Sequence, residues 1–156
     1  MASDRDRSFN KLGAALADLD EASRDRLKDA RVLAAAGHPA SALVAAYYSV
    51  EIRLKALICT RLDLLNLPTA FQTHDLEGLL TLSGLSRRME SSAPPGVRFY
   101  WEELVRLFPK LDVIRYLPEG SAVLLAIGQS SRDTSDLIAS LDHPTDGVLT
   151  WLSASP

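Results

Sequence analysis

The segment ASALVAAYYSVEIRLKALICTRLDL, residues 40–64, decides the fold of this chain. It is the longest stretch without Gly or Pro that is also strongly apolar. At 100° per residue, a helix here carries two adjacent apolar stripes and only a narrow strip suited to water. Because such a helix belongs inside a helical assembly, the segment predicts the central helix of an all-α domain, from about Pro39 to Leu64. The first stripe holds Leu43, Tyr47, Val50, Leu54 and Leu57, the second Val44, Tyr48, Ile58 and Leu62, and the strip suited to water Ala42, Ser49, Arg53 and Thr60.

Two charged residues interrupt this apolar segment. Glu51 and Lys55 are four residues apart, close enough on a helix to form an ion pair. One interpretation is a structural pair at a helix-packing seam. The other is a polar contact in a dimer interface, or a phosphate contact made by Lys55. Such i,i+4 pairs are common on helices, so the structural interpretation is favoured, and Tyr47 and Tyr48 belong to the core rather than to a base-stacking platform.

The flanking sequence predicts further helices. Residues 3–36 predict a long first helix that ends before Gly37, a typical helix stop. Pro39 then suits the first turn of the central helix, and so short a connection predicts an antiparallel hairpin. Downstream we expect a loop over 66–73, a short helix from Asp75 to Gly84, a mobile connection over 86–96, a helix over 97–108, irregular chain over 110–120, a helix over 133–141 and a short terminal helix over 148–152. The apolar run 122–127 fits either a helical turn or two, or a loop packed on the core.

Composition sets the class of protein. The 156 residues suffice for one domain, 1–156, with a substantial core. With 17 basic and 20 acidic residues the formal net charge is −3, which argues against a broadly basic nucleic-acid coat but leaves room for a local patch. A single cysteine, Cys59, fits a reducing compartment. The charged N-terminus lacks a signal-peptide core, and no uncharged apolar run is long enough to cross a bilayer. We therefore expect a cytoplasmic protein without membrane contact.

The order of several short motifs resembles the HEPN domains of prokaryotes, which are small helical bundles. These motifs span the chain from about residue 10 to the C-terminus. The resemblance implies an antiparallel bundle of four to five helices plus short helices, and a homodimer or a complex with a nucleotidyltransferase-like partner protein. It also implies a role in toxin–antitoxin systems, phage defence or RNA cleavage. We expect no cofactor. The motifs are Ala36-Gly37-His38, Glu51-x3-Lys55-Ala56-Leu57, Thr73-His74-Asp75-Leu76, Ile114-Arg115-Tyr116 and a terminal tryptophan, Trp151.

Active members of the family are metal-independent ribonucleases with an Arg-x(4–6)-His motif, whose two copies meet across a dimer interface. Arg115 stands where the arginine is expected, but the positions that would hold histidine are Gly120, Ser121 and Ala122. A histidine is the side chain that titrates near neutral pH. Its absence favours a catalytically degenerate module that acts by dimerisation and by binding a partner protein, a nucleotide or RNA.

Two other functions stay open. The first is a ribonuclease toxin in which Arg115 meets a remote histidine, His74 or His143, across a dimer. The second is a purely structural helical partner, such as the folded half of a toxin–antitoxin pair. Arg31 and His38 match the motif spacing formally, but they flank the turn between the first two helices and are set aside.

The candidate ligand-binding residues are Glu51, Lys55, His74, Arg115 and Tyr116. For His74 the favoured interpretation is structural: Thr73 or His74 caps the next helix while the ring bonds nearby backbone. The loop around His143 offers too few ligands for a metal ion, so no metal site is expected. Six basic residues between 87 and 115 form either a phosphate-binding face or a solvated surface neutralised by nearby acids: Arg87, Arg88, Arg98, Arg106, Lys110 and Arg115.

Overall fold

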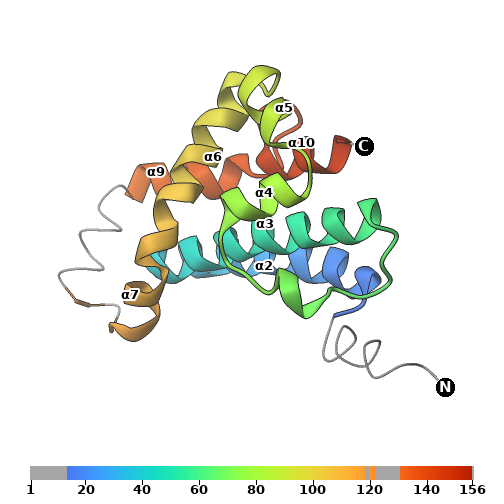
Figure 1. Cartoon of the computed structure of the whole chain (residues 1–156). Helices are drawn as coiled ribbons and strands as arrows, with labels where there is room; N and C mark the ends of the chain where they lie inside the picture. The colour runs from blue at the N-terminus through green and yellow to red at the C-terminus, as the bar shows by residue number, and fades with distance from the viewer. Residues whose placement is uncertain (1–13, 119, 122–130, 156) are drawn as a thin grey trace.

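The computed structural model describes residues 14–118, 120–121 and 131–155. These residues form helices joined by turns, and their β pairing is confined to one isolated bridge between Ala15 and Asn66 (Figure 1). The predicted all-α class is therefore confirmed. The helices are α2 (Leu16–Ala35), α3 (Pro39–Arg61), η1 (Thr69–Phe71), α4 (Leu76–Leu82), α5 (Ser86–Ser91), α6 (Pro95–Leu107), η2 (Phe108–Lys110), α7 (Leu111–Tyr116), α9 (Ser131–Ser140) and α10 (Val148–Ala154).

The first two long helices, α2 and α3, lie side by side as the predicted antiparallel hairpin (Figure 1). Gly37 reverses the chain between them with φ +82°, a conformation that glycine adopts without steric cost. Pro39 opens α3, where its missing N–H leaves no helical bond unmade. The Ser23 hydroxyl donates to the Ser49 carbonyl at 2.8 Å and joins the two helices near their middle. Residues 3–13 of the predicted first helix lie outside the described chain.

The central position of α3 is confirmed, because α2, α4, α7, α9 and α10 all pack against it. Every residue of the first apolar stripe is buried. The predicted water-facing strip is wrong at Ala42 and Ser49, which are fully buried because these small side chains let α2 approach closely. The helix also ends at Arg61 rather than at Leu64. Just beyond it, Asp63 takes a left-handed backbone conformation and Leu62 is exposed.

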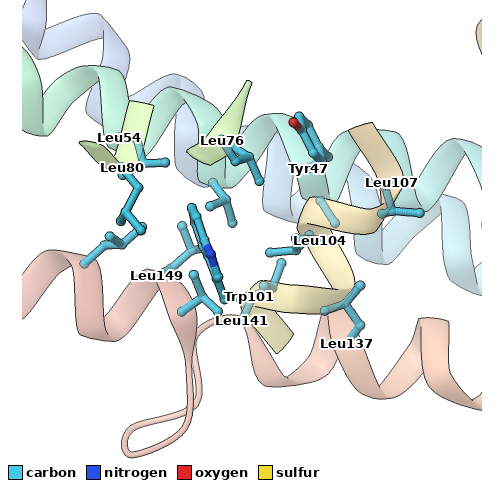
Figure 2. Close-up of a cluster of buried hydrophobic side chains, with 14 of the residues drawn as sticks. Tyr47, Leu54, Leu76, Leu80, Trp101, Leu104, Leu107, Leu137, Leu141 and Leu149 are labelled. Atoms are coloured by element: carbon cyan, nitrogen blue, oxygen red, sulfur yellow. The ribbon is translucent and has the colours of Figure 1, made fainter. Parts of the chain in front are cut away.

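A second group of helices packs against α3, and one of them, α9, also contacts α2. In Figure 2, Trp101 of α6 stands between α3 and the pair α9 and α10, and leucines of α3, α4 and α10 lie around the indole. Trp101 is 6% exposed, and Leu104, one turn later, is fully buried. The predicted helices over 97–108, 133–141 and 148–152 are thus confirmed as α6, α9 and α10 to within a few residues.

Two segments expected to be irregular are helical instead. Residues 86–91 form α5, whose Met89 is buried in the core. Residues 111–116 form α7, and its buried Leu111 and Ile114, three residues apart, anchor one face of that helix. The run 122–127 lies outside the described residues. None of the helices in the described ranges combines the length and the apolar character needed to cross a membrane.

Candidate functional site

The polar site begins with an ion pair inside α3. The Lys55 Nζ atom lies 2.6 Å from Glu51 Oε1, as the spacing predicted. The Glu51 side chain is only 4% exposed. Removing a carboxylate and an ammonium from water costs free energy that the pair regains only when further hydrogen bonds complete its surroundings. The carboxylate therefore needs a further partner, which comes from outside the helix.

That further partner is His74, in the loop before α4. Its Nδ1 atom lies 3.0 Å from Glu51 Oε2. One turn earlier on α3, the Tyr47 hydroxyl donates a hydrogen bond to the His74 backbone carbonyl. The Tyr48 ring packs on the imidazole at a centroid distance of 5.8 Å. The helix thus fixes both the backbone and the ring of His74, while 49% of the side chain stays exposed.

The predicted helix cap is wrong in its details. The side chain of Asp75, not of Thr73 or His74, accepts from the first turn of α4, with Oδ1 3.1 Å from the Glu77 N–H. Thr73 Oγ1 accepts from the Asp75 N–H at 3.2 Å. The imidazole is therefore not used for local backbone bonding and is available to Glu51.

The hydrogen bonds define the protonation of two groups. A carboxylate paired with Lys55 only accepts hydrogen bonds, so Nδ1 of His74 must donate, and in the neutral ring Nε2 is then an acceptor. Burial raises the pKa of Tyr47 well above its ordinary value, although a backbone hydrogen bond from Leu76 opposes this shift. Tyr47 consequently keeps its proton and remains a donor to His74.

His74 opens onto a cleft of about 410 Å³ between the loop before α4 and the segment formed by η2 and α7. Arg115 lines the same cleft. The guanidinium has one acidic neighbour on its own helix, Asp112, at 3.3 Å. The structure therefore brings His74 and Arg115 to one cleft within a single chain. The lining residues are Gln72, Thr73, His74, Phe108, Pro109, Leu111, Asp112 and Arg115.

The remaining predicted ligand residues do not line this cleft. Glu51 and Lys55 are buried within α3. Glu51 contacts the lining residue His74, and Lys55 contacts Glu51. Tyr116 is 82% exposed and is not among the lining residues. The predicted site did not include two lining residues, Asp112 and the buried Leu111. The spacing of Leu111 and Ile114 was the available signal that this segment is helical.

Other candidates are accounted for by local contacts. His143 Nδ1 lies 3.3 Å from the backbone N–H groups of both Thr145 and Asp146, which makes it a turn residue. Arg106 pairs with Glu103, and Arg98 bonds the Glu90 carbonyl, so these bases belong to a surface with interspersed acids. Within the described ranges, no three His, Cys, Asp or Glu side chains converge in a way that could hold a metal ion.

The family model of the HEPN domain matches residues 16–138, a range that includes α3, His74 and Arg115. The chain belongs to the HEPN family. The resemblance in motif order is thereby confirmed, over a somewhat shorter range than the motifs indicated. Searches of curated proteins and of solved structures find no match.

Proposed function

We propose that this HEPN domain binds RNA or a nucleotide through a phosphate group held by Arg115 in the His74–Arg115 cleft. It does so without cleaving the ligand, and it acts as a dimer or together with a partner protein. The observation that carries the proposal is that a half-exposed histidine and an arginine from distant parts of the sequence line one cleft.

Arginine suits this role because its planar guanidinium bonds two phosphate oxygens at once. In the free protein the group contacts Asp112 at 3.3 Å, between partly exposed side chains, and such exposed pairs contribute little stability. A phosphate dianion or diester can therefore displace the carboxylate. The overall charge of −3 opposes long-range attraction of RNA, so binding should be local and sensitive to salt.

The sequence that follows Arg115 lacks the histidine of the family's catalytic motif. The residues that would complete the family's Arg-x(4–6)-His motif are Gly120, Ser121 and Ala122, none of which transfers protons near neutral pH.

A second candidate function is a metal-independent ribonuclease, and one observation favours it. His74 lies in the cleft with a buried carboxylate behind it, an arrangement that supports proton abstraction from a ribose hydroxyl. Arg115 would then stabilise the negative charge that develops on the phosphate.

One binding experiment tests the leading proposal. Fluorescence anisotropy with a labelled single-stranded RNA of about 12 nucleotides, in EDTA, should show binding that Arg115→Ala weakens by about 10- to 100-fold, since charge-assisted hydrogen bonds are lost. Arg106→Ala is the matched control, because Arg106 pairs with Glu103 and lies off this cleft. Equal affinity of wild type and Arg115→Ala would contradict the proposal.

Gel analysis of the same RNA separates the two functions. Intact RNA after prolonged incubation supports the binding module. Cleavage that disappears in both Arg115→Ala and His74→Asn supports the ribonuclease instead. Light scattering of the purified protein, and of the protein mixed with a nucleotidyltransferase-like partner, measures the expected association.

A further inference from the structure

We infer that the groove between α4, α5 and α6 is a docking site for a lysine-bearing segment of a partner protein. The inference rests on the partner association of the proposed function, for which it names the surface and the chemistry of the partner. It does not depend on phosphate binding, because the groove shares no lining residue with the His74–Arg115 cleft.

The floor of this groove is apolar. The groove has a volume of about 330 Å³, and its lining includes Leu80 of α4, Met89 of α5 and Trp101 of α6. Each of these three residues is only 4–6% exposed. The methylene chain of a lysine packs on such an apolar surface while its ammonium group stays in a polar environment at the rim.

The rim of the groove carries an excess of negative charge from three exposed glutamates, Glu77, Glu90 and Glu102. Within the described residues, Glu77 and Glu90 form no ion pair, and Glu102 has a single contact of 3.8 Å with Arg106. Arg98 also lines the groove, but its guanidinium contacts the Glu90 backbone carbonyl at 3.4 Å rather than a carboxylate. Three carboxylates against one guanidinium give the lining a net charge of −2, which favours a cationic partner.

A hydroxyl group in the same lining adds a hydrogen-bond acceptor. Thr81 Oγ1 donates its single proton to the Glu77 carbonyl at 2.9 Å. In the 3.0 Å contact between the Thr81 and Ser86 hydroxyls, Ser86 must therefore donate, so its oxygen offers only lone pairs to a ligand. An ammonium group has three N–H donors and no acceptor. It therefore matches a rim formed by carboxylates and this hydroxyl oxygen.

Trp101 favours a peptide over a simple amine as the ligand. Within the described chain its indole N–H has no hydrogen-bond partner, and it is not among the fully enclosed polar atoms. Because Trp101 lines the groove with the small part of its surface that is exposed, this donor is accessible from the groove. A backbone carbonyl beside the lysine would accept this hydrogen bond, whereas a protonated alkylamine has no acceptor.

The indole N–H signal of Trp101 measures binding directly. The chain has two tryptophans, so the Trp151→Phe variant assigns the remaining indole signal in ¹H–¹⁵N spectra to Trp101. The probe is a short acetylated and amidated peptide with a central lysine between two leucines. Titration to about 5 mM, which measures affinities in the millimolar range, should move the signal downfield to saturation. Butylamine, which reproduces the lysine side chain without a carbonyl, should bind more weakly and cause no downfield shift.

Charge recognition is measured with a twin peptide whose lysine is acetylated. The twin should bind about 10-fold more weakly, because the hydrogen bonds from a charged group are lost. Replacement of the three rim glutamates by glutamine should make the two peptides bind equally, at the affinity of the twin for wild type. A matched control replaces three exposed acids outside the groove, alters the net charge by the same amount and should keep the 10-fold ratio: Asp18→Asn, Glu21→Gln and Asp63→Asn.

Three results would overturn the docking site: no saturable shift with the lysine peptide, equal affinity of wild type for the two peptides, or butylamine binding as tightly as the lysine peptide. Comparison with RNA separates this inference from phosphate binding. Arg115→Ala should bind the lysine peptide as wild type does. Wild-type protein that binds RNA but not the peptide contradicts the docking site alone, and protein that binds the peptide but not RNA contradicts phosphate binding alone.

Discussion

At the scale of single residues, Tyr47 links the core to the site. Its side chain is fully buried in α3, and its hydroxyl donates to the His74 carbonyl. Burial raises the pKa of this phenol, with smaller contributions in the same direction from Glu51 and Asp75. The folded chain therefore keeps the Tyr47 proton at alkaline pH values where the unfolded chain releases it.

This difference predicts a specific loss of stability at high pH. The ordinary pKa of a tyrosine side chain is about 10. The contribution of Tyr47 should be complete below about pH 10 and decline as the pH rises toward the folded pKa, by up to about 1.4 kcal/mol per pH unit for one proton. Urea unfolding at pH 9, 10 and 11 should show a steeper decline for wild type than for Tyr47→Phe, and parallel declines would refute the prediction.

The two contacts of Glu51 differ in how far the sequence predicts them. Its bond to Lys55 follows from helical spacing alone, because residues four apart share a face. Its bond to His74 joins residues separated by 23 positions and depends on the path of the loop that contains Pro68. Helical periodicity gives no information about that path, so the ring was expected to bond its own backbone.

At the scale of elements, α4 depends on its cap and its buried face. Seven residues are too few for a helix to be stable alone in water. Asp75 satisfies one free N–H at its start, and Leu76, Leu79 and Leu80 bury one side. Because His74 directly precedes this cap, the start of α4 also sets the position of the site.

Removal of the cap should therefore have a measurable cost. Asp75→Ala should lower the free energy of unfolding by about 1 kcal/mol, whereas Asp75→Asn should cost little because asparagine caps a helix equally well. Urea unfolding at neutral pH measures both variants. An equal loss in the two variants would show that the charge of Asp75, rather than its hydrogen bond to Glu77, is what stabilises α4.

Sequence predicts the long helices better than the short ones. Helices α2 and α3 carry many turns of periodic apolar residues, and Gly37 and Pro39 mark the boundary between them. Helices α5 and α7 have only six residues each and lie near Pro, Gly and Ser, so their composition resembles that of loops. They form because Met89, Leu111 and Ile114 are buried in the folded chain, which is tertiary information.

At the scale of the whole molecule, α9 and α10 pack directly against α3, and α6 packs against α10. Trp101 of α6 fills the space between α3 and the pair α9 and α10 (Figure 2). The central helix and its hairpin with α2 were predictable from the sequence. The path that brings Arg115 of α7 to the cleft of His74 depends on how α6 and η2 cross the bundle, and no local pattern encodes that crossing.

Truncation of Trp101 should destabilise the whole bundle. Trp101→Ala should lower the free energy of unfolding by about 3–5 kcal/mol, because it leaves a cavity between α3 and the pair α9 and α10. Phe99→Ala is the matched control on the same helix. Phe99 is 56% exposed, so its truncation should cost well under half as much. Comparable losses in chemical denaturation would contradict the assignment of Trp101 as a central core residue between α3, α9 and α10.

The buried pair in α3 has a consequence for the history of the family. Removal of either Glu51 or Lys55 alone strands a charge in an apolar interior, whereas exchange of both for apolar residues of similar volume is often tolerated or even stabilising. Simultaneous replacement of both residues during evolution could therefore preserve the helical fold. His74 would then lose the carboxylate that contacts its Nδ1 atom. Homologous sequences that retain both charges should be those in which the cleft is still under selection for use.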